Sequence, residues 1–440
     1  MATTLIRNAC IVTMNADLDV FSGEVLLEDD RISQVGAKLD VTADTVIDAG
    51  GKVLLPGFVQ THIHLCQTLF RGRADDLELL DWLRKKIWPL EAAHDEESIY
   101  YSALLGIGEL IRSGTTTILD METVRHTDFA FQAMAQSGIR AISGKVMIDH
   151  GDNVPSILYE ETAASLKESE ALLNKWHGYD SGRLQYAFCP RFVVSCTEEL
   201  LTGVRDLSKQ YNVLVHTHAS ENRGEIELVE LERKMRNVKY LDHIGLASPN
   251  LVLAHCVWLD EEEKEIIRER GVKVTHCPGS NMKLASGLAE IPDLLGRHIH
   301  VGIGADGAPC NNNLDMFQEM RLTAYIQKVQ HGPTVMNARS VLRLATIGGA
   351  EVLGLDHEIG SIEPGKKADL QLLDLYDFHA YPSFDVDLFS RIVYSATRGD
   401  VDTVFIDGKI VMENKTVKTM DKDLVLRESD RAIQRLLARI

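Results

Sequence analysis

Short runs of alternating apolar and polar residues occupy the first fifty-odd positions of the chain, a pattern typical of β-strands. The runs cover Leu5–Val12, Val25–Leu27 and Ile32–Val35, and Asp29-Asp30 supplies a turn between the last two. Together they predict a small antiparallel sheet near the N-terminus.

The same pattern returns towards the C-terminus. Asp369–Leu375 has the character of a strand, and Val401–Ile406 is joined to Ile410–Val417 through Asp407-Gly408, a dipeptide that favours a two-residue hairpin turn. The last stretch, Asp421–Leu437, is charged and amphipathic and predicts a helix.

Between these ends, short apolar strands alternate with long helical segments, which is typical of parallel βαβ units. The helices have clear limits: Asp260 is placed to cap one that ends at Arg270, before Gly271. The eight candidate strands are Leu54–His62, Thr115–Asp120, Ala141–Ile148, Leu184–Cys189, Val213–His218, Leu251–His255, Val272–His276 and His300–Gly304.

We therefore expect an α/β protein of two structural units. Residues 58–361 are predicted to form a (β/α)₈ TIM-type barrel, whose active site lies at the carboxyl ends of its strands. The strands of residues 1–57 and 362–440 have no helical partners between them. They are predicted to form one small composite β-sandwich domain built from both termini.

Composition narrows the range of functions. The chain has 440 residues, so a single small binding module is excluded, and its 45% apolar and 25% charged residues are usual for a soluble globular enzyme. Lys and Arg number 46 against 65 Asp and Glu, a formal net charge of −19. So acidic a surface repels phosphate backbones and anionic bilayers, which makes nucleic acid and membranes poor partners.

The sequence also predicts a cytoplasmic location. Arg7, Asp17 and Asp19 interrupt the apolar residues that a secretory signal would need. No apolar run approaches the roughly 20 residues that cross a bilayer. The 7 cysteines are scattered and include no CxxC pair, which favours reduced thiols over a disulfide framework.

Polar residues that bind metals end five of the eight predicted strands. A lone histidine there is more often a core residue than a ligand, but five such ends converge on one pocket if the barrel prediction holds. His62 and His64 share one face of their strand because they are two residues apart. The other strand ends contribute His216-Thr217-His218, His255, His276 and Asp306.

This convergence predicts a metal site. Three neutral imidazoles and a carboxylate suit zinc or ferrous iron, with one position left open for water. Such an ion lowers the pKa of bound water from 15.7 to about 7, so hydrolysis is the expected chemistry. Glu221, three residues beyond His218, is the natural proton shuttle; the alternative is a solvated acid at a helix start.

Several motifs together resemble the amidohydrolase superfamily over nearly the whole chain. They are Pro56-Gly57-Phe58-Val59 before His62-x-His64, His218-x-x-Glu221, Ala254-His255-Cys256, His276-Cys277-Pro278-x-Ser280-Asn281, Ala305-Asp306-Gly307 and the segment from Ile359 to Leu370. Within the superfamily the sequence is similar to the aminohydrolase branch, which holds guanine deaminases, methylthioadenosine/S-adenosylhomocysteine deaminases and triazine hydrolases.

The resemblance implies a hydrolase acting on C–N bonds of cyclic amidines, with one divalent metal per subunit, zinc or iron. It makes His62, His64, His218 and Asp306 the metal ligands, and Asp306 also the base that takes a proton from metal-bound water. Glu221 would pass a proton to the ring nitrogen, and His255 would steady the tetrahedral centre. Ammonia leaves, and the enzyme is expected to be a homodimer or larger.

The resemblance implies that the substrate is an amino-substituted nitrogen heterocycle, and two sets of residues favour different heterocycles. Gln67, Arg191 and Phe192 resemble guanine deaminases, and an arginine fork suits a 2-amino-4-oxo edge such as that of guanine or isocytosine. This is the leading expectation for a substrate.

Other residues favour an adenosine-type nucleoside, such as 5′-deoxyadenosine or methylthioadenosine. Trp82, Trp88 and Glu91 resemble a loop of methylthioadenosine deaminases whose glutamate binds ribose hydroxyls; alternatively they belong to an amphipathic lid helix packed on the barrel. The absence of an arginine near Asp149-His150-Gly151 counts against S-adenosylhomocysteine. An aminotriazine hydrolase, or a metal-bearing scaffold without turnover, are further alternatives.

Overall fold

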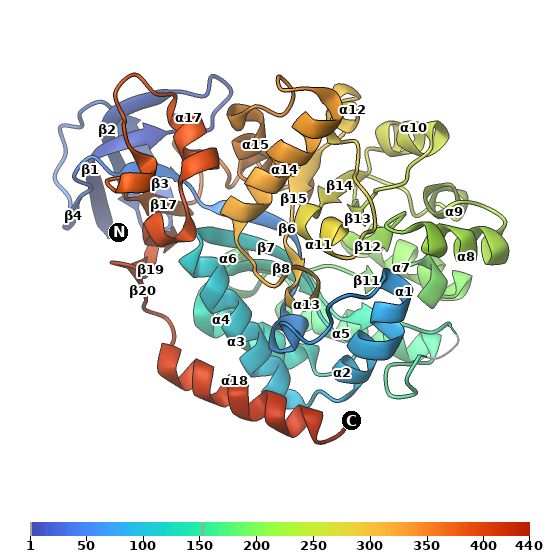
Figure 1. Ribbon diagram of the computed structural model, residues 1–440. Helices are drawn as coiled ribbons and strands as arrows, with labels where there is room; N and C mark the ends of the chain where they lie inside the picture. The colour runs from blue at the N-terminus through green and yellow to red at the C-terminus, as the bar shows by residue number, and fades with distance from the viewer. Residues whose placement is uncertain (1, 152–153) are drawn as a thin grey trace.

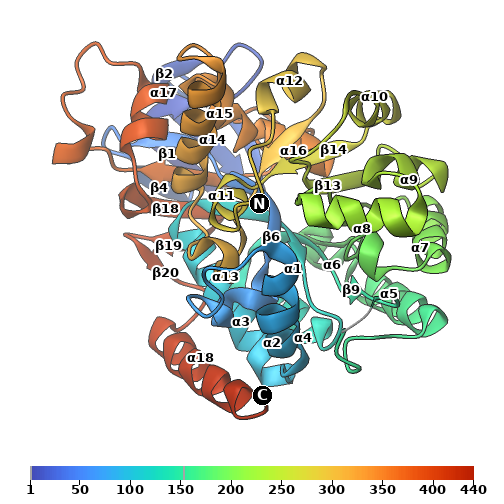
Figure 2. The same cartoon turned by 45° about the vertical axis from the view of Figure 1, so that its right-hand side comes forward.

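The computed structural model describes residues 2–151 and 154–440, whose strands form two large sheets and one short strand pair (Figure 1). Figures 1 and 2 place the sheet built from the two ends of the chain at one side of the molecule, and α8, α9 and α10 at the opposite side. Within the described residues, none of the helices is both long and apolar enough to span a bilayer.

The first sheet contains strands from both ends of the chain, in the order β20-β19-β18-β17-β5-β1-β2-β3, with β4 beside β1. Its strands are β1 (Thr3–Val12), β2 (Val20–Glu28), β3 (Arg31–Gly36), β4 (Thr45–Asp48), β5 (Val53–Pro56), β17 (Leu370–Leu373), β18 (Val401–Ile406), β19 (Lys409–Glu413) and β20 (Thr416–Val417). We call it the terminal sheet. The N-terminal strands are not purely antiparallel as expected, because β4 and β5 both return to the free edge of β1 and run parallel to it.

The predicted hairpin at Asp407-Gly408 is present. Both residues have positive φ, +48° and +70°, as a type I′ turn requires, and β18 pairs antiparallel with β19. The predicted strand over Ile410–Val417 is interrupted, because Asn414 and Lys415 also have positive φ and turn the chain into β20.

The second sheet is parallel throughout, in the order β10-β8-β7-β6-β15-β14-β13-β12, with β16 beside β6. Its strands are β6 (Phe58–His64), β7 (Thr115–Met121), β8 (Arg140–Gly144), β10 (Leu184–Tyr186), β12 (Val215–Ala219), β13 (Leu251–His255), β14 (Lys273–His276), β15 (Val301–Ile303) and β16 (Asp306–Gly307). Beyond β10, the N–H of Phe188 donates to the Leu214 carbonyl, and the Phe188 carbonyl accepts from His216, each at 2.9 Å. These bonds connect the two ends of this strand order.

Three of the predicted strands are each divided in two. The expected strand over Leu54–His62 comprises β5 of the terminal sheet and β6 of the parallel sheet, separated at Gly57. A Cβ at Gly57 would lie 2.1 Å from the Thr116 side chain, so only glycine fits where the chain passes between sheets. β8 and β10 likewise end early, and the two-residue strands β9 (Val146–Met147) and β11 (Cys189–Pro190) pair separately.

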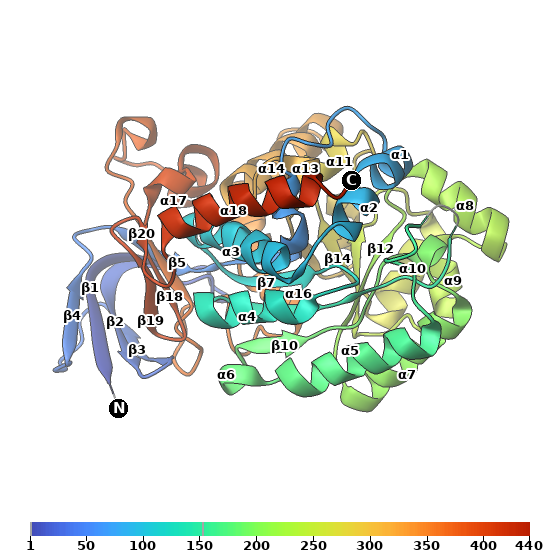
Figure 3. The same cartoon turned by 90° about the horizontal axis from the view of Figure 1, so that it is seen from below.

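Helices follow most strands of the parallel sheet. They are α1 (Leu79–Trp82), α2 (Trp88–Ala92), α3 (Glu96–Arg112), α4 (Thr127–Ser137), α5 (Thr162–Trp176), α6 (Tyr179–Gly182), α7 (Glu198–Tyr211), α8 (Arg223–Arg233), α9 (Asn237–His243), α10 (Glu261–Arg270), α11 (Pro278–Lys283), α12 (Ile291–Gly296), α13 (Ala308–Asn311), α14 (Met316–His331), α15 (Ala338–Leu344), α16 (Ile347–Leu353), α17 (Leu388–Ser390) and α18 (Lys422–Leu437). As predicted, Asp260 caps α10 by accepting from the Glu263 N–H, and Gly271 ends it with φ +66°. The C-terminal helix α18 lies along α3 (Figure 3).

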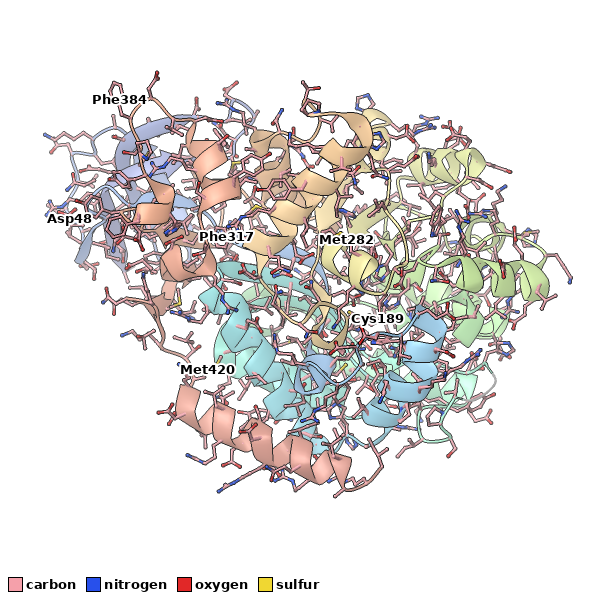
Figure 4. All side chains as sticks on the ribbon, viewed as in Figure 1. Asp48, Cys189, Met282, Phe317, Phe384 and Met420 are labelled. Atoms are coloured by element: carbon pink, nitrogen blue, oxygen red, sulfur yellow. The ribbon has the colours of Figure 1, made fainter. Side chains whose placement is uncertain are left out.

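Buried contacts fix the parallel sheet to its surroundings. Phe58, at the start of β6, packs edge-on against Phe317 of α14, with ring centroids 5.1 Å apart (Phe317 is labelled in Figure 4). Arg140 of β8 donates to Asp369 at 2.7 Å and also pairs with Asp407 of the terminal sheet. These contacts fix the starts of β6 and β8 against α14 and the terminal sheet. The polar residues lie at the opposite, carboxyl ends of the strands.

Candidate active site

The four residues expected to bind a metal lie together. His62 and His64 end β6, His218 lies near the end of β12, and Asp306 begins β16, which pairs with β6. The Oδ1 atom of Asp306 is 3.3 Å from the Nε2 atoms of both His62 and His64. The Nε2 atoms of His64 and His218 are 3.2 Å apart. The sequence prediction that these strand ends converge is therefore matched by the geometry.

Hydrogen bonds on the far side of the rings orient two of these imidazoles. His64 Nδ1 lies 2.8 Å from the Met121 carbonyl, and His218 Nδ1 lies 2.7 Å from the Arg191 carbonyl. A carbonyl only accepts, so each Nδ1 carries the proton and each Nε2 presents a lone pair towards the centre of the cluster.

The charge states suit a divalent cation. Burial lowers the pKa of His64 to about 3 and that of His218 well below its ordinary value, so both rings are neutral. Burial opposes ionisation of Asp306, but its contacts with His62 and the neighbouring imidazoles outweigh that effect and hold its pKa well below the ordinary value. His62 Nε2 is buried and has no hydrogen-bond partner within the described residues. A buried ring nitrogen that has no hydrogen-bond partner and lies beside a carboxylate fits the position of a metal ligand.

A second group of titratable side chains adjoins these ligands. His255 Nε2 is 3.4 Å from Glu221 Oε2 and 3.9 Å from Asp306 Oδ2, while His255 Nδ1 bonds the Asn281 Oδ1 atom at 2.8 Å. Burial raises the pKa of Glu221 to about 7. A carboxyl group with that pKa can hold and release a proton near neutral pH, as a proton shuttle requires.

These side chains line a small cavity of about 20 Å³. It is lined by His64, Gln67, Leu79, Trp82, Leu83, Arg191, Phe192, His218, Glu221, His255, Leu284 and Asp306. No sequence pattern pointed to Leu284, which follows the short helix α11. Leu79 and Leu83 could have been found from their i, i+4 spacing beside Trp82, which places them on one face of a helix.

Of the expected substrate-binding residues, Gln67, Arg191 and Phe192 line the cavity, and Glu91 holds two of them by hydrogen bonds. Arg191 Nη1 donates to Glu91 Oε2 at 2.7 Å, and Gln67 Nε2 donates to Glu91 Oε1 at 2.8 Å. Glu91 and Trp88 are buried but do not line the cavity. The reason is that α2 directs the Glu91 carboxylate at Arg191, so the arginine fork expected to meet substrate is bound to the protein itself.

The segment that carries Trp82, Trp88 and Glu91, for which a substrate-binding loop and a lid helix were the two interpretations, is helical but irregular. α1 leads into a π-helical turn over Leu83–Ile87, which leads into α2, and Trp82 and Leu83 reach the cavity. His276, another of the polar residues expected at a strand end, lies at the end of β14 outside the cavity lining. Burial lowers the pKa of His276 to about 3, so this ring is neutral.

Comparison with known proteins identifies this arrangement. A model of the amidohydrolase family matches residues 53–411. The chain belongs to the amidohydrolase family. A 5′-deoxyadenosine deaminase of Methanobrevibacter smithii is 44% identical to this amidohydrolase over 436 residues, which cover 99% of this chain and 98% of the relative.

Two further similar proteins are also named as deaminases. A 5-methylthioadenosine/S-adenosylhomocysteine deaminase of Desulfitobacterium hafniense is 39% identical over 98% of both chains. The crystal structure of an adenosine deaminase from Xanthomonas campestris with bound zinc has a TM-score of 0.93 and 32% identity, and the match covers 99% of each chain. This amidohydrolase is therefore a hydrolase of the α/β fold class that acts on C–N bonds of cyclic amidines, and its reaction is hydrolytic deamination.

Proposed function

We propose that this amidohydrolase deaminates an adenosine-type nucleoside, with 5′-deoxyadenosine as its principal substrate. The observation that carries the proposal is the buried ion pair between Arg191 and Glu91, at 2.7 Å. Recognition of a 2-amino-4-oxo edge would use the guanidinium fork, and here both of its terminal nitrogens donate to the Glu91 carboxylate. A purine with a 6-amino group makes no such demand.

The relatives support the same substrate class. Those at 44% and 39% identity are named for 5′-deoxyadenosine and for methylthioadenosine or S-adenosylhomocysteine. The guanine-like base that Gln67, Arg191 and Phe192 favour in the sequence is not supported by these relatives. We therefore adopt the alternative interpretation of the sequence, in which the substrate is an adenosine-type nucleoside.

The reaction replaces the amino group of the purine by the oxygen of water and releases ammonia. A divalent ion held by His62, His64, His218 and Asp306 would supply activated water at neutral pH. Asp306 accepts a proton from the attacking water, and Glu221 passes one to the ring nitrogen beside the attacked carbon. His255 stands between these two carboxylates and steadies the oxygen that gains charge.

The same proposal includes the larger architecture. The hydrogen bonds of Phe188 support closure of the parallel sheet into a (β/α)₈ barrel over residues 58–361. Residues 1–57 and 362–440 would then form one composite domain around the terminal sheet. We assign zinc to the metal site, one ion per subunit, because the donors are imidazole and carboxylate and a 32% identical neighbour was determined with zinc.

The test is a comparison of kcat/KM for 5′-deoxyadenosine, adenosine, methylthioadenosine, S-adenosylhomocysteine and guanine, with ammonia release as the readout. We expect 5′-deoxyadenosine to exceed guanine by at least a hundredfold, about 3 kcal/mol of transition-state binding. A higher value for guanine would refute the substrate assignment. No ammonia from any of these substrates, with zinc bound, would favour a scaffold without turnover.

A further inference from the structure

One imidazole of the ligand cluster is oriented differently from the other two. His64 and His218 direct Nδ1 at backbone carbonyls, whereas His62 Nδ1 lies 2.7 Å from the Nε2 atom of a side chain, His216. His216 belongs to β12, two residues before His218, and both His62 and His216 are fully buried.

Two ring nitrogens at this distance share one proton, and the surroundings decide which of them carries it. The other nitrogen of His216, Nδ1, is 3.1 Å from the Val252 carbonyl on β13. Because a carbonyl accepts only, the proton of the neutral His216 ring resides on Nδ1 and its Nε2 is an acceptor. His62 must then donate from Nδ1, which leaves His62 Nε2 with a free lone pair.

That free lone pair is the atom directed at the metal position. His62 Nε2 lies 3.3 Å from Asp306 Oδ1 and has no partner within the described residues. If the proton were on His62 Nε2 instead, an N–H would point at the cation and this ligand would be lost.

We propose that His216 is a positioning residue that fixes the tautomer and orientation of His62 through the series Val252 carbonyl, His216, His62. The proposal rests on the metal site of the proposed function. It distinguishes His62 from the other two histidines: their acceptors are backbone atoms that no substitution removes, whereas the acceptor for His62 is a replaceable side chain. His216 itself does not touch the metal position or the substrate.

The experiment measures zinc affinity of the full chain by competition with a chromogenic chelator, independently of turnover. His216→Phe and His216→Leu place an apolar side chain at this buried position and remove the Nε2 acceptor. We expect zinc to bind 10- to 100-fold more weakly to both. His216→Gln supplies one acceptor and one donor in place of the ring, and we expect its zinc affinity to lie within about threefold of the wild type, below the range of losses seen when an outer-shell partner is removed.

The absorption of bound Co²⁺ gives a second readout, because its visible bands report ligand geometry rather than stability. We expect altered bands in the Phe and Leu variants and wild-type bands in the Gln variant. His94→Phe is the matched control: His94 is also buried and bonds a carbonyl, that of Cys66, but lies outside the cavity lining, so its zinc affinity should be unchanged.

The outcomes separate this proposal from the proposed function. Zinc affinity within twofold of the wild type in folded His216→Phe or His216→Leu would overturn the role of His216 and leave the metal site intact. Wild-type protein that takes up no zinc, cobalt or ferrous iron would overturn both. Where the Phe variant does not fold, the smaller Leu variant and the Co²⁺ spectrum of the Gln variant decide the matter.

Discussion

Replacing Glu221 by glutamine should abolish deamination and, at the same time, stabilise the metal-free protein. The carboxyl group lies 3.4 Å from His255 and accepts from Ser286 Oγ at 3.3 Å, and it is almost completely shielded from water. Glutamine keeps the shape and an acceptor oxygen but cannot carry the shuttled proton. Loss of a general acid or base typically costs 10²- to 10⁴-fold in rate.

The size of the stabilising effect follows from the pKa of Glu221. Burial raises it from an ordinary 4.5 to about 7, so the folded protein binds this proton more tightly than the unfolded chain does. The contribution of Glu221 to the stability of the wild type is therefore most favourable below pH 4.5, and it declines as the pH rises towards about 7. At about 1.36 kcal/mol for each pH unit, the loss amounts to about 3 kcal/mol. The variant has no such titration.

Urea unfolding of the metal-free proteins at pH 5 and pH 8 measures this effect. We expect the free energy of unfolding of Glu221→Gln, relative to wild type, to rise between these two pH values by roughly 2 to 3 kcal/mol. Contributions from groups that do not contact Glu221 cancel in the difference. Glu227→Gln on α8 is the control, because that carboxylate is exposed to solvent and its removal should leave the difference independent of pH.

A relative stability that is the same at pH 5 and pH 8 would refute the assignment of Glu221 as a carboxyl group held in a costly buried position. Retained ammonia release by the zinc-loaded variant would refute its role in proton transfer. The two results are independent, since one concerns the ground state of the metal-free protein and the other the reaction.

Three other predictions concern the scaffold and the metal. Gly144→Ala should lower the free energy of unfolding by at least about 3 kcal/mol, because the new Cβ would lie 1.8 Å from the Ala187 carbonyl; Gly296→Ala, with nothing within 4 Å, should show no such loss in the same urea titration. Glu91→Gln should cost about 3 to 5 kcal/mol by leaving the Arg191 charge buried and unpaired, and replacing both residues by uncharged ones should recover part of that loss. Dialysis against a chelator should abolish ammonia release, and zinc or ferrous iron should restore it as elemental analysis approaches about one ion per chain.

Features set by neighbouring residues could be predicted from the sequence. The cap and end of α10 depend on Asp260 and Gly271, and the hairpin depends on Asp407-Gly408, so these were placed correctly. The convergence of His62 and Asp306 was also predictable, because parallel strands present their carboxyl ends at one edge.

Features that arise from contacts between distant residues could not be predicted. Glu91 and Arg191 are 100 positions apart, and nothing near either indicates that they neutralise each other. The division of the first predicted strand at Gly57 was hidden for a related reason. Both halves are apolar, and only the side chain of Thr116, brought close by folding, requires a glycine there.

The pairing of β5 with β17 has a consequence for the order in which the chain is synthesised. Residues Val53–Pro56 pair with Leu370–Leu373, so one edge of the N-terminal strands stays unpaired until over 300 further residues have been made. At 5 to 20 residues per second, that interval is roughly 15 to 60 seconds. An open strand edge is a template for association between chains. A nascent or truncated chain that ends before Leu370 should therefore depend on chaperones, and precipitate without them.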